Sequence, residues 1–383
     1  MRVVLERSNL LKSLGHVQRV VERRNTIPIL SNVLLRARDG RLTLKATDLD
    51  LEVTEDVAAA VEVEGSTTVP AHMLYDIVRK LPDGSEVRLA EEGGTMQLSA
   101  GRSQFKLQVL PETDFPDLTA GEFAHAFKIA PDAMKALIDR TQFAISTEET
   151  RYYLNGIYLH AVDGDGGAKL RAVATDGHRL AQAEVDAPEG TAGMPSVIVP
   201  RKTVGELQKL LDNAEGEVGV EVSEAKIRIT LTDGSSEVVL TSKLIDGTFP
   251  DYNRVIPTGN EKQLRLDRET FARAVDRVST IASDRGRAVK MSMDDGQLTL
   301  SVNNPDSGFA EEELPVGYEA DKLDIGFNSR YLLDITGQLT ADETTFWLAD
   351  PGSPTLIRDA ASEGADDAKS GIGALYVLMP MRV

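Results

Sequence analysis

MRVVLERSNLLKSLGHVQRVV (residues 1–21) begins with alternating apolar residues and continues with apolar residues spaced as on one face of a helix. The same order recurs in FKIAPDAMKALIDRTQFAI (127–145) and LRLDRETFARAVDRVSTIA (264–282). Ser8, Pro131 and Asp267 are the predicted helix starts, because Ser and Asp cap helices and Pro suits the first turn. The three stretches, about 130 residues apart, predict three copies of one domain.

The segments that follow each of these helices repeat as well. Residues 32–48, 153–176 and 288–304 read as hairpins around a glycine-containing turn, and residues 67–89, 196–222 and 324–348 read as strand, helix and strand. We therefore predict an α+β fold of three tandem copies, each with two helices packed on antiparallel sheets. The predicted domains are residues 1–120, 127–254 and 255–383.

Composition limits the class of protein. The 383-residue chain has no cysteine, which excludes a disulfide framework, a thiolate metal site and a cysteine nucleophile. It contains no apolar run long enough to span a membrane, so we expect a cytoplasmic protein without membrane contacts. A net charge of −19 ordinarily argues against binding to nucleic acid, unless positive charge is concentrated in one place.

Positive charge is concentrated near the N-terminus. Residues 1–24 contain six Lys or Arg and two Glu. If the first helix continues through residue 23, Lys12, His16, Arg19 and Arg23 fall within about 60° of one another, opposite an apolar face. One such stripe is typical of a solvated helix face, but weaker versions recur on the later helices and predict contacts with phosphates. The basic residues singled out are Lys12, His16, Arg19, Arg23, Arg79, Lys80, Arg201 and Lys202.

ATDGHRL (174–180) brings together residue types that are common in active sites. Asp176 and His178 suggest a hydrolase dyad, which we keep as the alternative function. However, ATD also occurs at Ala46–Asp48, at the same place in the repeat, and an Asp that accepts backbone N–H groups in a turn explains this recurrence. The chain also lacks the G-x-S-x-G, H-E-x-x-H and G-x-x-x-x-G-K-[ST] motifs. The sequence therefore favours a structural turn.

Seven segments, in order and spacing, resemble those of the bacterial DNA polymerase III beta subunits, the sliding clamps. They are RYYLNG (151–156), ATDGHRL (174–180), SVIVPRK (196–202), TSKLIDG (241–247), FPDY (249–252), IGFN (325–328) and MPMR (379–382). The resemblance covers essentially the whole chain. It implies a ring-shaped head-to-tail dimer, a homodimer that encircles duplex DNA. It also implies a processivity factor for DNA replication that is not an enzyme and needs no cofactor or metal.

Helix packing supports two chains per ring. If helices line the hole side by side at roughly 10 Å, the six helices of one chain leave about 9 Å free, whereas twelve leave about 28 Å. Only the larger hole admits B-DNA. Such a hole keeps cations away from the base edges, so the attraction to phosphates does not depend on sequence and the ring can slide.

The resemblance also implies site residues. Arg24, Tyr152 and Tyr153 match positions that contact DNA in the family, while His72 and Glu148 depart from its usual pattern. Phe105 and Leu107 match one side of the dimer interface, and Thr280 and Ile281 match the other. For these apolar residues, burial in a domain core is the alternative interpretation.

A cleft for partner peptides is implied where ATDGHRL meets the C-terminal segment. The partners implied are the DNA polymerase III catalytic subunit, an ATP-dependent clamp loader and repair or replication proteins with a clamp-binding peptide. The simpler alternative is that MPMRV only completes an edge strand. The predicted cleft residues are Leu154, Thr175, Gly177, His178, Arg179, Leu180, Pro250, Arg254, Val255, Asn328, Tyr331, Val377, Met379, Pro380, Met381 and Arg382.

Overall fold

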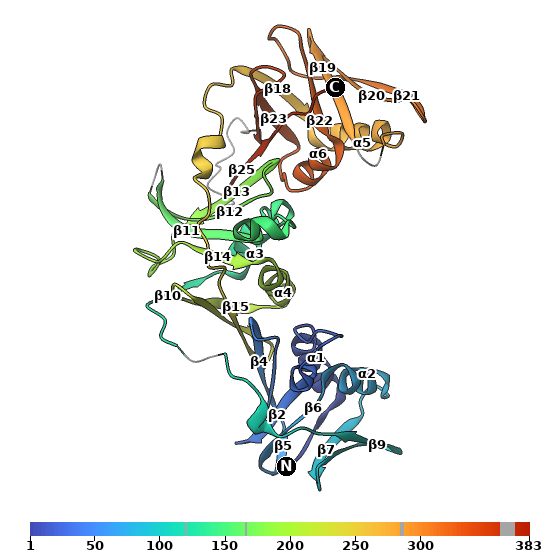
Figure 1. Ribbon diagram of the computed structural model, residues 1–383, viewed down its shortest axis with the longest axis vertical. Coiled ribbons are helices and arrows are strands. Elements are labelled where there is room, and N and C mark those ends of the chain that lie inside the picture. The colour runs from blue at the N-terminus through green and yellow to red at the C-terminus, as the bar shows by residue number, and fades with distance from the viewer. Residues whose placement is uncertain (119–120, 165–166, 284–286, 361–371) are drawn as a thin grey trace. The chain divides into compact units, whose positions relative to one another are not determined.

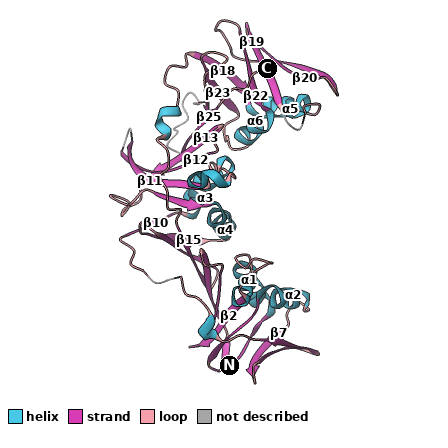
Figure 2. Ribbon diagram, viewed as in Figure 1, coloured by secondary structure: helices cyan, strands magenta, loops and turns pink. Residues whose placement is uncertain are grey.

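The computed structural model describes residues 1–118, 121–164, 167–283, 287–360 and 372–383 (Figure 1). Two helices and a set of antiparallel strands recur three times along the chain (Figure 2). The first copy contains β1 (Arg2–Glu6), α1 (Arg7–Val17), β2 (Asn32–Arg38), β3 (Arg41–Thr47), β4 (Leu51–Ala58), β5 (Ala60–Val63), β6 (Gly65–Pro70), α2 (Ala71–Lys80), β7 (Glu86–Glu92), β8 (Thr95–Ala100) and β9 (Ser103–Gln108).

The second and third copies repeat this order, without a counterpart of β5 among their described residues. The second contains β10 (His125–Ile129), α3 (Pro131–Asp139), β11 (Gly156–Gly164), β12 (Gly167–Thr175), β13 (Arg179–Asp186), β14 (Val197–Pro200), α4 (Arg201–Leu211), β15 (Glu215–Val222), β16 (Lys226–Asp233) and β17 (Ser236–Lys243). The third contains β18 (Lys262–Asp267), α5 (Arg268–Ser279), β19 (Ala288–Asp294), β20 (Gln297–Asn304), β21 (Gly308–Pro315), β22 (Leu323–Asn328), α6 (Ser329–Thr336), β23 (Glu343–Leu348), β24 (Thr355–Asp359) and β25 (Ile372–Leu378).

Two of the three predicted helix starts are confirmed. Pro131 is the first residue of α3. Asp267 caps α5 by accepting a hydrogen bond from the backbone N–H of Thr270 at 2.7 Å. Hydrogen bonds from the side chain of Thr270 and from its backbone N–H lower the pKa of the Asp267 carboxyl group. Ser8 lies in the first turn of α1, which begins at Arg7, but it does not cap the helix: its hydroxyl donates to Glu6 Oε1 at 2.9 Å.

One compact unit comprises Met1–Lys135 and Pro188–Ile245. Its larger sheet has the strand order β10-β15-β16-β17-β4-β3-β2-β6, and its smaller sheet has the order β5-β1-β7-β8-β9. Because β4 pairs with β17, strands of the first and second copies belong to one sheet. Helices α1 and α2 pack together and bury Leu10, Leu14 and Leu74 completely. Their apolar faces therefore form the core of the first copy.

The other compact unit comprises Ala136–Ala187 and Asp246–Val383. Within it, the larger sheet has the order β11-β12-β13-β25-β24-β23-β18, and the smaller sheet has the order β21-β20-β19-β22. The pairing of β13 with β25 joins the second and third copies in the same way as β4 and β17 join the first two. Phe271 of α5 packs edge to face on Phe346 of β23, with ring centroids 5.5 Å apart.

Strands β9 and β21 each lie at an edge of a smaller sheet. Among the described residues, each has a strand partner on one side only. Both edges carry an exposed aromatic side chain: Phe105 on β9 is 37% exposed and Phe309 on β21 is 64% exposed. Open strand edges with exposed apolar groups can pair with another chain.

Candidate DNA-binding and peptide-binding surfaces

The prediction that the basic residues form a stripe on one face of the first helix was wrong. Helix α1 ends at Val17, so residues 18–24 form a loop, which we call the arginine loop. His16 is buried, with Nδ1 2.7 Å from Glu55 Oε2. Lys12 Nζ lies 2.6 Å from Asp233 Oδ1, which neutralises its charge within the protein. Spacing alone could not reveal these buried carboxylates, which come from other strands and turns.

The arginine loop presents three cations to solvent. Arg19, Arg23 and Arg24 are all exposed. Beyond the end of α1, the backbone carbonyls of Val20 and Val21 accept from Lys202 Nζ (3.2 Å) and from His72 Nε2 (2.8 Å). These bonds replace the N–H partners that the carbonyls would have in a continued helix. Positive charge is thus concentrated as predicted, but on a loop held by side chains of α2 and α4.

The other basic residues predicted to contact DNA differ in how exposed they are and in whether a carboxylate already pairs with them. Arg201 and Lys80 are exposed, and Arg79 is exposed although its Nη2 lies 3.1 Å from Asp76 Oδ1. Lys202 pairs with Asp48 at 2.6 Å and with Glu22 at 2.5 Å. Burial alone would lower the pKa of Lys202, but its hydrogen bonds to these two carboxylates outweigh burial and raise it.

Tyr152 and Tyr153 form an edge-to-face pair in the segment before β11. Their ring centroids are 5.8 Å apart, and Tyr152 is 53% exposed. Gly247 lies against the pair, since a Cβ atom there would come within 3.0 Å of Tyr153 Cβ. Glu148, one of the departures from the family pattern, pairs with Arg151, and this hydrogen bond lowers its pKa. Its charge is therefore matched inside the protein.

The two ATD segments form the same turn. Asp48 Oδ1 accepts from the backbone N–H groups of Asp50 (2.9 Å) and Leu51 (2.7 Å). Asp176 Oδ1 accepts from the equivalent groups of His178 (2.9 Å) and Arg179 (3.1 Å). These contacts confirm the predicted structural turn. At the next position the second copy has Gly177 (φ 89°), where the first has Leu49 (φ 80°), a strained conformation for leucine.

The C-terminal segment lies beside ATDGHRL, as predicted. Strand β25 pairs with β13 in the register Leu180↔Val377, and the chain then continues with a hydrogen bond from Met379 N to His178 O (3.0 Å). Met381 N donates to Gly326 O at 2.8 Å. The junction of the first and second copies has the same backbone frame, with Lys243 N donating to Asp50 O (2.8 Å) and Ile245 N to Ile198 O (3.0 Å).

Arg179, predicted as a residue of the peptide cleft, is engaged inside the protein. Its side chain is 10% exposed and pairs with Asp176 and Asp334, and Nη2 donates to Phe143 O at 2.6 Å. Its guanidinium carbon lies 4.2 Å from the ring centroid of Tyr331. Arg179 therefore fixes the turn to α6. Sequence reasoning missed Asp334 and Phe143 because nothing in their local sequence marks them as its partners.

The remaining predicted cleft residues differ in burial and in role. Leu154, Leu180 and Val377 are buried and support the surface from below. Gly177 does not leave open space, because a Cβ atom there would come within 2.6 Å of Arg151 Nη1. Thr175 and Asn328 hold the turn and the start of α6 through hydrogen bonds to backbone groups. The partly or fully exposed members are His178, Pro250, Arg254, Val255, Tyr331, Met379, Pro380, Met381 and Arg382.

An aromatic cluster holds the FPDY segment in place. Tyr158 stacks on Phe249 with ring centroids 4.7 Å apart. The Tyr252 hydroxyl lies 3.1 Å from His160 Nε2 and accepts from Arg171 Nη1 at 3.0 Å. Burial, aided by the charge of Arg171, lowers the pKa of His160 to about 4. This largely buried network fixes the segment that carries Pro250, and sequence reasoning missed it.

The predicted dimer residues lie near the two sheet edges. Leu107 on β9 is 5% exposed, which fits the alternative of a core residue, whereas Phe105 is exposed. Thr280 is exposed and Ile281 is half-buried just after α5. Asn304 Nδ2 donates to the carbonyl of Ile281 at 2.7 Å, which ties this end of α5 to β20.

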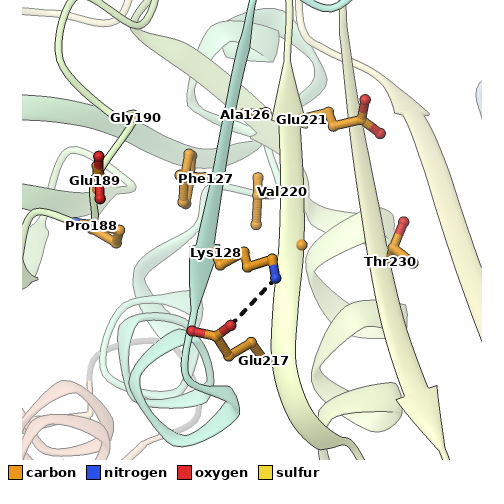
Figure 3. Close-up of a pocket in the computed structure, with 11 residues that line it drawn as sticks. Ala126, Phe127, Lys128, Pro188, Glu189, Gly190, Glu217, Val220, Glu221 and Thr230 are labelled. Carbon is orange, nitrogen blue, oxygen red and sulfur yellow. Dashed lines mark ion pairs between the residues drawn. The ribbon is translucent and has the colours of Figure 1, made fainter.

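A groove of about 780 Å³ lies on the sheet face formed by β10, β15 and β16 (Figure 3). Gly219 and Ala126 line it, and Lys128 Nζ lies 3.5 Å from Glu217 Oε2 beside it. None of the predicted site residues lines this groove. Among the described residues, no group of three or more His, Asp or Glu side chains could hold a metal ion.

The described part of the chain has no helix with both the length and the apolar character needed to cross a membrane.

Comparison with known proteins identifies the family. Models of the N-terminal, central and C-terminal domains of the DNA polymerase III beta subunit match residues 1–119, 128–251 and 253–382. The chain is 51% identical to the beta sliding clamp of Caulobacter vibrioides and 40% identical to that of Pseudomonas aeruginosa, over the full length of each. A crystal structure of the Bartonella birtlesii sliding clamp bound to griselimycin matches with a TM-score of 0.94 and 57% identity, covering 100% of both chains. The chain therefore belongs to the family of DNA polymerase III beta subunits, the bacterial sliding clamps.

Proposed function

We propose that this protein forms a closed head-to-tail dimer that encircles duplex DNA in the cytoplasm. Arg19, Arg23 and Arg24 of the arginine loop contact the phosphates of the DNA. The observation that supports this is the exposure of three arginines on one short loop of a chain whose net charge is −19. Exposed Lys80, Arg79 and Arg201 add to the positive charge. Long, mobile cations attract phosphates without reading bases, so the ring slides.

Ring closure uses the open edges of β9 and β21 from two copies. The β9 edge carries exposed Lys106, with exposed Arg102 in the turn just before the strand, whereas the β21 edge carries exposed Glu311 and Glu313. The edges are thus complementary in charge as well as in backbone hydrogen bonding. Phe105, with Leu107 beneath it, is the apolar contact on one side, and Thr280 and Ile281 are its counterparts. The three domains are residues 1–120, 127–254 and 255–383.

The surface beside the C-terminus binds short peptides of DNA enzymes. Met379 is 40% exposed, and its backbone N–H donates to the carbonyl of His178, so an apolar group faces solvent next to the fixed turn of Asp176. Val255 is a further exposed apolar residue, at 47%. Methionine adapts to different side chains, which suits a site shared by several partners. The partners proposed are the DNA polymerase III catalytic subunit, an ATP-dependent clamp loader and other proteins with a clamp-binding peptide.

The DNA role can be tested with a nicked circular plasmid, a clamp loader and ATP. We expect the loaded protein to remain on the circle at high salt and to leave once the plasmid is cut, because a closed ring is held by topology. Replacing Arg19, Arg23 and Arg24 with Glu should reduce loading. The matched control replaces three exposed cations elsewhere, Arg265, Lys322 and Arg358, with Glu. Equal loading by both variants would contradict the role of the arginine loop.

A further inference from the structure

The shape of the arginine loop depends on a side chain from another copy. Lys202, the second residue of α4, reaches the Val20 carbonyl (3.2 Å) and the Glu22 carboxylate (2.5 Å) of the loop. It also reaches Asp48 Oδ2 at 2.6 Å, in the ATD turn. One ammonium group has three donors, and these three acceptors account for all of them. Lys202 therefore has no donor left for a phosphate.

The second junction contains a related arrangement, in which the cation comes from the turn itself. There Arg179 contacts the turn carboxylate of Asp176, the carbonyl of Phe143 and a third acceptor, Asp334. Phe143, like Val20, lies in the turn just after the first helix of its copy. Each junction thus uses one cation to fix the ATD turn to the segment behind the first helix. In the first copy, that segment is the arginine loop.

We propose that Lys202 is a positioning residue for the arginine loop and not a phosphate contact. The part of this proposal that concerns DNA rests on the function proposed above. His72 is a second anchor, since its Nε2 lies 2.8 Å from the Val21 carbonyl oxygen. Together the two side chains hold consecutive carbonyls, so the direction of the three arginines is set by α2 and α4.

A substitution of Glu22 tests the proposal, because a purely electrostatic role and an anchoring role predict different changes in DNA affinity. Glu22 lies in a loop that faces phosphates, so charge alone predicts that Glu22→Gln strengthens DNA binding by removing repulsion. If Glu22 serves to hold Lys202, the same change loosens the loop and DNA binding does not become stronger. The two outcomes are separable by fluorescence anisotropy with a labelled 30-base-pair duplex.

The direct test compares Lys202→Met with Arg201→Met, which removes the same charge from the adjacent exposed residue. Binding of the duplex is measured over a salt series, and the rate of trypsin cleavage after Arg23 and Arg24 is measured without DNA. For Arg201→Met we expect unchanged cleavage and a salt slope reduced by about one. For Lys202→Met we expect cleavage at least threefold faster than in the parent protein. We also expect Arg24→Ala to weaken DNA binding less in the Lys202→Met background than in the parent protein.

Unchanged cleavage together with a reduced slope for Lys202→Met would overturn the proposal and make Lys202 a phosphate contact. Faster cleavage with unaltered DNA binding would support the anchoring of the loop but contradict its proposed contact with DNA. Thermal melting and sedimentation of each variant establish that it is folded and dimeric. If Lys202→Met does not fold, Glu22→Gln provides the same cleavage test while Lys202 remains in place.

Discussion

The carboxylate of Asp176 accepts a hydrogen bond from the backbone N–H of His178, with Oδ1 and N 2.9 Å apart. The imidazole ring lies elsewhere, stacked near Tyr331 with ring centroids 6.4 Å apart. A hydrolytic dyad requires the carboxylate to orient the ring. The pair therefore builds a turn, and the hydrolase alternative loses its geometric basis.

Asp176→Asn should lower the stability of the fold and should not remove any catalytic activity. The amide oxygen can still accept the backbone N–H groups, but the ion pair with Arg179 is lost. We expect a loss of about 1–2 kcal/mol, because hydrogen bonds to charged groups contribute about that much. Urea unfolding measures it, with Asp48→Asn as the equivalent change in the first copy. A hydrolytic activity that disappears in His178→Ala would contradict this interpretation.

Arg179→Lys should be costly although it keeps the charge. Lysine cannot contact both carboxylates and the Phe143 carbonyl as the planar guanidinium does. We expect about 2 kcal/mol of lost stability and weaker peptide binding, since the turn shifts. Chemical denaturation and peptide anisotropy are the measurements. Arg254→Lys, at a side chain that is 84% exposed, is the control and should leave stability unchanged.

Deleting Met379–Val383 should separate peptide binding from assembly. These residues include the exposed Met379 and the hydrogen bond from Met381 to Gly326, whereas β9 and β21 are untouched. We expect an unchanged dimer by sedimentation and at least tenfold weaker binding of a clamp-binding peptide, which corresponds to about 1.4 kcal/mol. Retained affinity would mean that the peptide binds elsewhere.

Ile281→Lys should shift the protein from dimer towards folded monomer. A lysine in the proposed interface would bury an unpaired charge, which costs several kcal/mol. Sedimentation at a series of concentrations measures the dissociation constant. Gln263→Lys adds the same charge at an exposed position on β18 and should leave the dimer intact. A tight dimer in both variants would reject this interface.

Stability should fall in mild acid partly because of His160. Its folded pKa, about 4, is below the ordinary value of 6.5, so the unfolded chain binds a proton first as pH falls. The contribution of neutral His160 to the free energy of unfolding is intact above about pH 6.5 and is lost progressively as the pH falls towards 4. We expect about 1–2 kcal/mol of the loss between pH 7 and pH 5 to come from His160, after allowance for screening. Urea unfolding of His160→Gln should lack this part, and identical pH profiles would rule it out.

The repeat made the fold predictable. Hairpins and strand–helix–strand units appear where periodicity places them, and Pro131 and Asp267 start helices for local reasons. Family membership confirms the predicted class, the processivity function of a sliding clamp and the prediction that the chain is not an enzyme. The domain boundaries and individual site residues remain predictions.

The errors came from long-range contacts. Periodicity extended α1 through Arg23, but the carbonyls of Val20 and Val21 are held by side chains from α4 and α2. Likewise, Arg179 looked available for a ligand because its partner Asp334 lies 155 residues away in the sequence. Charge patterns locate cations along the chain, but only the tertiary fold shows which of them are already neutralised.

The two open strand edges differ in charge, with Lys106 on β9 and Arg102 in the turn before it, and with glutamates on β21. In the proposed ring, each edge therefore needs the other edge of a second copy and cannot satisfy itself. A variant with one edge disrupted by mutation would still bind an intact chain through its second edge. The resulting dimer would have one interface formed and one open, so the ring could not close. In a cell that makes both forms, such a protein would be a dominant inhibitor, and its effect would grow with its share of the mixture.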